Sequence, residues 1–433
     1  MLVHPYSERR ARLIERLGGA PAVIPSARIV TRSADTEFAF RQDSDFFYLT
    51  GFDEPDAVLV IAPAHPREHV VLFLRPRDRT SEIWNGSRLG VQSAPEHLGV
   101  DAAFSIDELA KRLPEYLVGA RALYYELGRD ERFDRTVREA LQEAHVRARR
   151  KGRVPTAIVE PGELLHEMRL RKEPAEIEAM RGAAAATAQG HLAGMRATRP
   201  GAAEYEIKAA IEFEYYRRGG EPAYPSIVAA GDNATILHYT AVRAPLRDGE
   251  LLLVDSGCEL DLYACDVTRT WPVNGRFSAE QRAIYEIVLA AQESGIEQVR
   301  SGRSIRAFHD ACVRTITEGL IDIGLLSGSA EENIEKERFR DYYMHGSGHW
   351  IGLDVHDVGR YRDDADEHRL FEPGMVTTVE PGIYVHRDLE CDERFKGIGV
   401  RIEDDVLVTA TGNEVLTSAI PKRIDDVQTA VKP

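Results

Sequence analysis

The sequence predicts an α+β protein of two domains, the second of which is built from two similar halves. Three observations lead to this fold class: a length of 433 residues, a change of pattern near residue 168, and a strand motif that occurs twice after that point. A chain of this length has room for two or three domains, each with its own core. We therefore predict a smaller domain over residues 1–168 and a larger one over residues 169–433.

The first of these domains alternates short β-rich runs with helical patterns. The apolar runs DFFYLTGF, AVLVIAP and VVLFLRP are typical of strands, whereas SIDELAKRLPEYL and DRTVREALQEAH have helical periodicity. This alternation predicts an α/β domain. The following segment, PTAIVEPGELLHEMRLRKEPAEI, leads into a long amphipathic helix, and we place the domain boundary there.

The second domain contains an internal repeat. In DGELLLVDSGC, Asp255 lies six residues after one glycine and two before another, and Glu380 in EPGMVTTVEPGI has the same spacings. Each unit returns with a strand that carries a second acid nine residues before a glycine, Asp266 in YACDVTRTWPVNG and Glu403 in VRIEDDVLVTATG. Because helical stretches precede both units, we expect a pseudo-twofold domain with the four acids clustered on its axis.

Four ionised carboxylates in one small pocket require positive charge. At a separation of about 4 Å, each like-charge pair costs on the order of 4 kcal/mol even at an effective dielectric constant near 20. Taken singly, each acid has a structural explanation as a turn former or a strand-edge solubiliser, but acids in apolar strands such as LLLVD are costly and here the placement is repeated. Two divalent cations would balance the four charges, and an oxygen-rich set with one imidazole suits manganese better than zinc.

The spacing of the histidines and cysteines near these strands indicates which of them can join the site. His345, His349 and His356 fall within twelve residues among glycines, which let a ligand approach closely, and His238 lies in ILHYT. A lone histidine is more often a core or surface residue, but three in one short segment favour a site. Strand periodicity places Cys258 opposite Asp255 and Cys265 opposite Asp266, so we expect both thiols to be packing residues. It also places Thr268 on the inward face with Asp266, which it could orient, and Arg401 on one face with Glu403.

Composition narrows the class of protein. A formal net charge of -16 disfavours nucleic acid and anionic membrane surfaces as partners. Four cysteines without a C-x-x-C pair do not form a disulfide scaffold, and the charged N-terminus does not resemble a secretory signal. With no apolar run long enough for a membrane span, we expect a cytoplasmic protein.

These motifs resemble the creatinase, prolidase and methionine aminopeptidase superfamily, peptidase family M24. The resemblance covers nearly the whole chain and is closest to the bacterial aminopeptidase P group, whose N-terminal domain is similar to TRSADTEFAFRQDSDFFYLTGFDEPDAVLVI and SEIWNGSRLG. It implies a pita-bread catalytic domain behind a creatinase-like N-terminal domain. It further implies hydrolysis of the bond between an N-terminal residue and a following proline, by a hydroxide held between two metal ions.

The resemblance also implies roles for individual residues. Its five metal ligands correspond to Asp255, Asp266, His349, Glu380 and Glu403, which would hold two Mn²⁺ per subunit, with Co²⁺ or Zn²⁺ as alternatives. Asp266 and Glu403 would bridge the ions, and Glu380 would also carry the proton to the proline nitrogen. The outer residues of the family site correspond to His238, His345, His356, Tyr384 and Arg401, which would bind substrate or support the metals. The alternatives for Tyr384 and Arg401 are a packing tyrosine and a surface arginine.

Several alternatives stay open on the sequence alone. A prolidase shares the metal site but cuts only Xaa-Pro dipeptides, whereas a creatinase does not use this metal set. A non-catalytic pita-bread binding module is the alternative of another class, although such modules typically lose the ligands that are present here. We expect peptides with proline at the second position as substrates, and a homodimer or homotetramer. In the first domain, Trp84 and Asp35 are candidates for reaching a neighbouring subunit's site, with packing or capping as their alternative roles.

Overall fold

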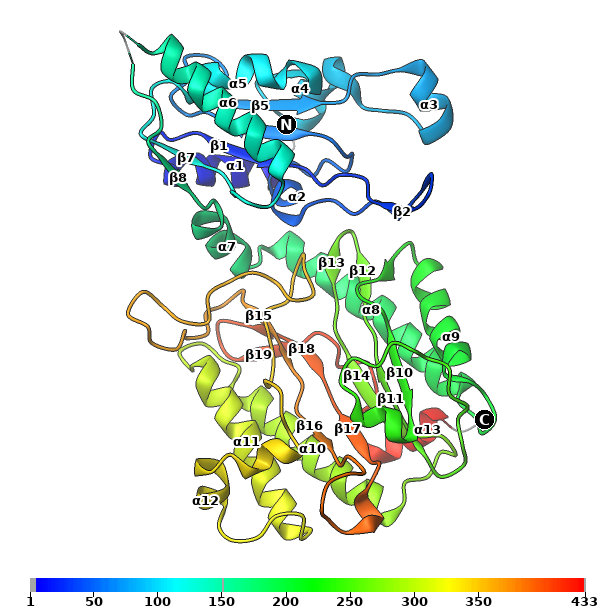
Figure 1. Cartoon of the computed structure of the whole chain (residues 1–433). Coiled ribbons are helices and arrows are strands. Elements are labelled where there is room, and N and C mark those ends of the chain that lie inside the picture. The colour runs from blue at the N-terminus through cyan, green and yellow to red at the C-terminus, as the bar shows by residue number, and fades with distance from the viewer. Residues whose placement is uncertain (1–4, 150–151, 432–433) are drawn as a thin grey trace. The chain divides into compact units, whose positions relative to one another are not determined.

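The chain divides into two units, Met1–Glu167 and Met168–Pro433 (Figure 1). The computed structural model describes residues 5–149 and 152–431. Among these residues, no helix is both long and apolar enough to cross a membrane. The units are described separately below.

The first unit is built on one six-stranded sheet with the order β6-β5-β4-β1-β7-β8. Its strands are β1 (Ala22–Pro25), β4 (Val58–Ile61), β5 (Val70–Leu74), β6 (Ala102–Ser105), β7 (Ala122–Tyr124) and β8 (Ala157–Val159), and a separate hairpin joins β2 (Thr31–Ser33) to β3 (Thr36–Glu37). Its helices are α1 (Pro5–Arg16), α2 (Ser44–Thr50), α3 (Arg79–Asn85), α4 (Gly90–Leu98), α5 (Leu109–Leu117) and α6 (Glu131–Arg147). Strand β4 pairs antiparallel with both β1 and β5, and the other pairs are parallel. The predicted α/β domain is thus the fold of this unit.

One predicted strand of this unit is a helix. The run DFFYLTGF forms α2, because the carboxylate of Asp43 accepts a hydrogen bond from the Phe46 amide and caps the first turn. Gly51 ends the helix in the left-handed conformation, with φ of 62°. Phe46, Tyr48 and Leu49 are buried. A short aromatic run has the same composition in a buried strand and in a buried helix, so only the caps distinguish the two.

The second unit repeats one arrangement of strands. In the first half, β11 (Leu251–Asp255) pairs with β10 (Ile227–Ala230) and β14 (Thr268–Pro272), and the short strands β12 (Cys258–Leu260) and β13 (Tyr263–Ala264) form a hairpin. In the second half, β15 (Val376–Val379) pairs with β18 (Asp404–Val408), β18 pairs with β19 (Asn413–Val415), and β16 (Gly382–Tyr384) pairs with β17 (Gly399–Arg401). Strands β11 to β14 therefore correspond in order to β15 to β18. The internal repeat found in the sequence is a repeat of structure, as a pita-bread fold requires.

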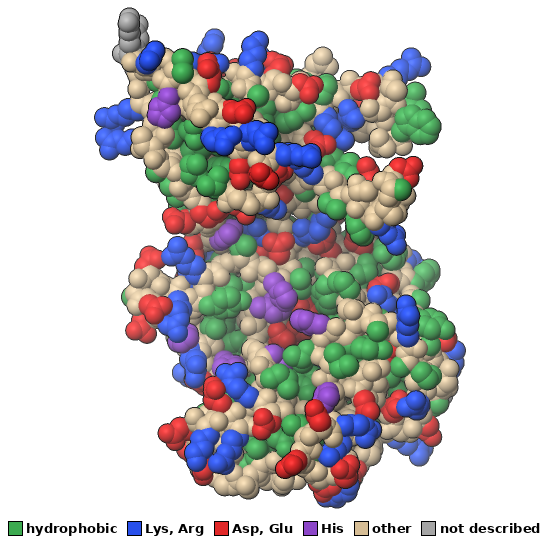
Figure 2. All heavy atoms as spheres, viewed as in Figure 1, with side chains coloured by type: hydrophobic (Ala, Val, Ile, Leu, Met, Phe, Trp, Pro, Cys, Tyr) green, Lys and Arg blue, Asp and Glu red, His purple; other side chains and the backbone are tan. Residues whose placement is uncertain are grey.

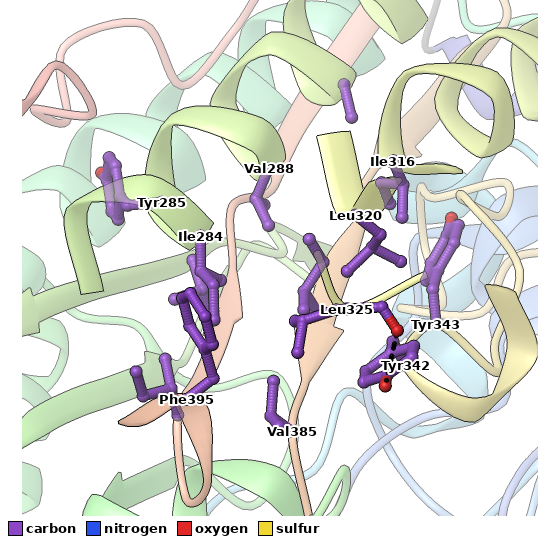
Figure 3. Packing of buried hydrophobic residues seen from close by; sticks show 14 of the residues in the cluster. Ile284, Tyr285, Val288, Ile316, Leu320, Leu325, Tyr342, Tyr343, Val385 and Phe395 are labelled. Atoms are coloured by element: carbon purple, nitrogen blue, oxygen red, sulfur yellow. Dashed lines mark hydrogen bonds between the residues drawn. The ribbon is translucent and has the colours of Figure 1, made fainter. Parts of the chain in front are cut away.

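Helices cover each half of the repeat. Helices α8 (Pro174–Ala197) and α9 (Glu204–Tyr216) pack together, α8 beside β12 and β13 and α9 beside β10 (Figure 1). Helices α10 (Ala279–Gln298) and α11 (Ile305–Asp322) pack together as well, with α10 beside β15 and β16. The remaining helices are α7 (Gly162–Leu170), α12 (Ala330–Glu335) and α13 (Ile424–Val431), and β9 (Glu221–Pro222) extends the β12 sheet. Figure 3 shows the core beneath α10 and α11, where Ile284, Val288 and Leu320 point toward Val385. Each Å² of apolar surface that such a core removes from water stabilises the fold by about 25 cal/mol.

Arg269 of β14 joins the two halves of the repeat. Its side chain is fully buried and donates five hydrogen bonds. One goes to the Glu403 carbonyl at 2.5 Å and one to the Asp404 carboxylate at 2.7 Å, both in the second half. Lys422 pairs with the other oxygen of Asp404 at 2.7 Å. The pairing with these two cations holds the pKa of Asp404 below its ordinary value although burial alone would raise it.

We expect Arg269→Met to lower the free energy of unfolding by about 3–5 kcal/mol, because it leaves buried carbonyl acceptors without donors and removes one of the two cations that pair with buried Asp404. Urea unfolding of the full chain measures this loss. Arg282→Met is the matched control, since Arg282 is exposed on α10 and its one ion pair within the described residues is with Glu286 across one helical turn. Its loss should stay within about 0.5 kcal/mol. A loss below about 1 kcal/mol for Arg269→Met would contradict the role of this residue.

Candidate metal centre

The four repeated acids lie where strands end or break. Asp255 is the last residue of β11, Glu380 lies between β15 and β16, Asp266 between β13 and β14, and Glu403 between β17 and β18. The sequence analysis expected Asp266 and Glu403 inside strands, and this detail was wrong. At such a break the backbone leaves the ladder, so a side chain can turn into the space between the two halves.

All five predicted ligands line one cavity of about 300 Å³ in the second unit. The predicted outer residues His238, His345, His356 and Arg401 line it too. Asp266, His349 and Glu403 offer ligand atoms that lie within 4.8 Å of one another. Figure 2 shows histidine side chains beside acidic ones on the face of this unit. The structure thus gathers residues that are 148 positions apart in sequence, from Asp255 to Glu403.

Tyr224 is a residue of this centre that the sequence analysis missed. Its hydroxyl group lies 2.6 Å from Asp255 Oδ1 and also donates toward Asp266 Oδ1. Burial and the neighbouring carboxylates raise its pKa well above the ordinary value, so it stays a donor. Tyr224 lies in EPAYPSIV just before β10, which pairs with the strand of Asp255. That pairing could have suggested it, but no motif marks the tyrosine.

Arg401 connects the acids to two of the outer residues. Its guanidinium donates to Asp255 Oδ2 at 2.6 Å and to the Tyr384 hydroxyl at 2.9 Å. His345 Nε2 lies 2.8 Å from the same hydroxyl. Arg401 and Tyr384 are 4% and 1% exposed, so they are neither the surface arginine nor the merely packing tyrosine that the sequence left open. They form one chain of hydrogen bonds that ends on an acid of the cavity.

Thr268 orients a different acid from the one predicted. Its hydroxyl donates to Glu403 Oε2 at 2.6 Å and accepts from Arg401 Nε at 2.9 Å, whereas the strand period had pointed to Asp266. The period fails because the chain leaves the strand between these two residues. Asp266 is held instead through its backbone amide, which donates to Asp405 Oδ2 at 3.1 Å.

The cysteines lie behind the centre. Cys258 and Cys265 are fully buried, each within an apolar cluster. Burial raises the pKa of both thiols, that of Cys258 to about 12. Neither lines the cavity.

Burial and mutual repulsion shift the ionisation of the acids. Burial raises the pKa of Glu380 to about 7, and burial together with the charge of Asp266 raises that of Glu403 well above its ordinary value. Burial also raises the pKa of Asp255, although Arg401 opposes the shift. Burial lowers the pKa of His349, but its hydrogen bond to Asp266 and the charge of Glu380 outweigh this and raise it to about 9. The acids thus compete for positive charge.

The outer histidines differ in exposure. The His356 ring meets the His349 ring edge to face, with centroids 4.4 Å apart. Burial and the neighbouring His349 lower the pKa of His356, and burial with the nearby Arg401 lowers that of His345 to about 3, so both are neutral hydrogen-bonding groups. His238 is exposed at the edge of the cavity, on the segment after β10.

The two candidates in the first unit lie on exposed segments. Trp84 belongs to α3, a helix without a buried residue, and is 83% exposed. Asp35 lies in the turn between β2 and β3 and is exposed. Neither packing nor the capping of a helix accounts for Trp84, and its role across subunits stays a prediction.

The donor set fits divalent metal ions. Four carboxylates and His349 face the cavity, and among the described residues that line it Arg401 is the one arginine or lysine. Carboxylate oxygens with one imidazole nitrogen are the ligands of hard to intermediate cations such as Mn²⁺, and thiolates are absent from the lining. Without bound cations the repulsion has to be relieved by protonation, as the raised pKa values of Glu380 and Glu403 indicate.

Such a site within a pita-bread fold defines a class of metal-dependent hydrolases. The family model for metallopeptidase family M24 matches residues 178–410, and that for the aminopeptidase P N-terminal domain matches residues 6–124. A Xaa-Pro aminopeptidase of Haemophilus influenzae is 46% identical over 98% of this chain and 96% of its own. The structure of Pseudomonas aeruginosa aminopeptidase PepP superposes with a TM-score of 0.96 at 44% identity, covering 98% of this chain and 97% of that one. A zinc-substituted aminopeptidase P of Escherichia coli, in complex with product, gives 0.95 at 44% identity, with 99% and 97% covered.

The chain belongs to metallopeptidase family M24, in its aminopeptidase P group. It is therefore a metal-dependent aminopeptidase, and the binding module considered from the sequence is excluded.

We expect Glu403→Gln to weaken Mn²⁺ binding at least 10-fold, because it removes one charge from the three residues that approach most closely. Calorimetric titration of chelator-treated protein measures this, and the rise in melting temperature on adding Mn²⁺ should shrink in parallel. Glu286→Gln, an exposed carboxylate on α10, should bind Mn²⁺ like the wild type. Unchanged binding by Glu403→Gln would remove this residue from the ligand set.

Proposed function

We propose that this enzyme hydrolyses the peptide bond between an N-terminal residue and a following proline, using two Mn²⁺ ions. The observation that carries this proposal is the cavity of about 300 Å³ lined by four carboxylates and His349. This volume lies at the small end for binding pockets and suits the end of a peptide rather than its middle. The preference for proline is supported by the similarity to Xaa-Pro aminopeptidases over nearly the whole chain.

The five residues would share the two ions unequally. Following the family pattern, Asp266 and Glu403 would bridge them, Asp255 would complete one, and His349 with Glu380 the other. The proximity of ligand atoms from Asp266, His349 and Glu403, within 4.8 Å, supports a common metal site for these three residues. Divalent ions bound there would acidify a water molecule and polarise the carbonyl group to be cleaved.

Glu380 is the residue we assign to proton transfer. Its carboxylate lies in the cavity wall, with Oε1 3.6 Å from His349 Nε2 and 3.3 Å from the Thr378 hydroxyl. The Glu380 amide donates to the Ser347 carbonyl at 2.8 Å, which fixes the backbone beneath it. Glu380 would take a proton from the attacking water and deliver it to the proline nitrogen, a tertiary amide nitrogen that leaves poorly until it is protonated.

The outer residues would bind and orient the substrate. Neutral His356 and exposed His238 face the cavity and can hydrogen-bond a peptide carbonyl or the oxygen that becomes negative during attack. His345, Tyr384 and Arg401 form the hydrogen-bond chain that holds Asp255 in place. The cytoplasmic location and the homodimer or homotetramer expected from the sequence also stay part of this proposal.

A matched pair of peptides tests the substrate class. We expect manganese-loaded protein to release alanine from Ala-Pro-Ala with a higher kcat/KM than from the dipeptide Ala-Pro. A metal assay on the same protein should find two cations per chain. Cleavage of the dipeptide alone would favour a prolidase, and cleavage of neither by protein that holds two metals would refute the proposed function.

We expect Glu380→Gln to lower kcat by about 10²–10⁴-fold. The glutamine side chain keeps one oxygen that can bind a metal, but it cannot accept the proton. Steady-state cleavage of Ala-Pro-Ala at saturating Mn²⁺ measures the loss, and Glu286→Gln again serves as the control. Less than a 10-fold loss with full metal content would assign proton transfer to another group.

A further inference from the structure

One segment of the cavity wall is a loop whose hydrogen-bond partners include a residue that does not line the cavity. This loop, residues 231–244, follows β10 and begins with the single 3₁₀ turn η2 (Gly231–Thr235). Leu237 and His238 near its middle line the cavity. His238 is exposed, so its position depends on the loop rather than on packing of its own side chain.

Glu204 accepts four hydrogen bonds from the ends of this loop and from its middle. It is the first residue of α9, and its side chain is fully buried. Its Oε1 accepts from the Ala230 amide at 2.9 Å and from Asn233 Nδ2 at 3.0 Å. Its Oε2 accepts from the Tyr239 hydroxyl at 2.9 Å and from the Ala244 amide at 2.8 Å. One carboxylate therefore joins the start of the loop through one oxygen and its end through the other.

The loop has independent restraints on its first part. A Cβ atom at Gly399 of β17 would collide with the Ala234 carbonyl, so η2 packs directly on the strand that carries Arg401. Asp232 pairs with Arg387 at 2.5 Å. The start of the loop is thus fixed against β17. The return from Ile236 to Ala244 is held by the burial of Val242 and by a backbone bond from the Glu204 amide to the Ala244 carbonyl at 3.0 Å. Its remaining restraints are the bonds that Tyr239 and the Ala244 amide donate to the Glu204 carboxylate.

The return segment is also strained. Val242 has a φ of 49°, in the left-handed region that β-branched residues rarely adopt. Its side chain is 6% exposed within the apolar cluster under α9. Such a conformation persists only where the surroundings hold it, and the Ala244 amide bonded to Glu204 lies two residues away. Removing the carboxylate would therefore let this half of the loop relax.

We propose that Glu204 is a positioning residue for substrate binding, which holds loop 231–244 closed so that His238 and Leu237 face the metal centre. The side chain itself touches neither the metal ligands nor the cavity among the contacts described for it. Its effect passes through His238. This inference rests on the proposed function for its kinetic test, but not for its structural one.

The variant that tests it is Glu204→Gln, which keeps the size of the side chain. Oε1 faces two N–H donors, so the new NH₂ group would have to replace Oε2, where Tyr239 can accept instead of donate. The Ala244 amide would then face a donor and lose its partner. We expect kcat/KM for Ala-Pro-Ala to fall about 10- to 100-fold with unchanged metal content. Tyr239→Phe, which removes one donor only, should lose less and is the safer variant for folding.

A double-mutant cycle separates positioning from general destabilisation. In protein that already carries His238→Ala, adding Glu204→Gln should change kcat/KM by less than about 2-fold, because the residue it positions is gone. Glu286→Gln, which changes an exposed carboxylate on α10, should behave like the wild type. Equal losses with and without His238 would overturn the inference.

Hydrogen exchange tests the same inference without activity. Amides of residues 236–244 should exchange faster in Glu204→Gln and in Tyr239→Phe, while those of β11 and β15 keep their protection. Unchanged exchange in this segment would overturn the role of Glu204. If the wild type cleaves no Xaa-Pro peptide, the proposed function fails, and faster exchange would still support Glu204 as the residue that holds the loop.

Discussion

Repulsion among four carboxylates within one cavity is the constraint on which the rest of the second unit depends. Asp255, Asp266, Glu380 and Glu403 face the same cavity of about 300 Å³, where Arg401 pairs with Asp255 and His349 lies near Asp266 and Glu380. Each like-charge contact costs several kcal/mol at short range. The Tyr224 and Thr268 hydroxyls donate to these carboxylates, and the amides of Glu380 and Glu403 fix the backbone by donating to carbonyl groups. This arrangement becomes favourable once cations bind.

The repeat is the structural means by which this cluster is assembled. Each half supplies one acid at the end of β11 or just after β15, and one just before β14 or β18. Two copies around a pseudo-twofold axis therefore bring four acids to the axis. The halves must then be joined firmly, because a small relative shift would separate the acids that line one cavity. Arg269 makes that joint, since it bonds Glu403 and Asp404 of the other half next to the acids themselves. The segment Glu403–Asp404 therefore both carries an acid of the cavity and joins the two halves.

Much of this was predictable from the sequence because a repeat is visible as spacing. The pseudo-twofold fold and the gathering of Asp255 with Glu403 follow from glycines and acids at equal intervals. Predictions from local periodicity were wrong where a helix cap or a strand break intervened. The run DFFYLTGF forms helix α2 because Asp43 and Gly51 cap it, and Thr268 bonds Glu403 rather than Asp266 because the strand begins between them. Tyr224 and Glu204 were missed for another reason. Their partners are distant in sequence, and a tyrosine before a strand or a glutamate at a helix start has no distinctive pattern.

Buried acids in this unit are satisfied in three different ways, and the comparison identifies the functional cluster. Asp404 and Asp357 pair with protein cations, Arg269 and Lys422 for the first, Arg169 and Lys172 for the second. Glu204 has no cation among the partners described for it and is satisfied by four neutral donors. Both solutions are complete within the protein and serve to hold backbone in place. The acids of the cavity share one guanidinium and too few donors, so their charge is completed only from outside. The incompletely compensated carboxylates that line the cavity are therefore available to a ligand, whereas Glu204 shows how the same group, fully compensated, fixes a loop beside that cavity.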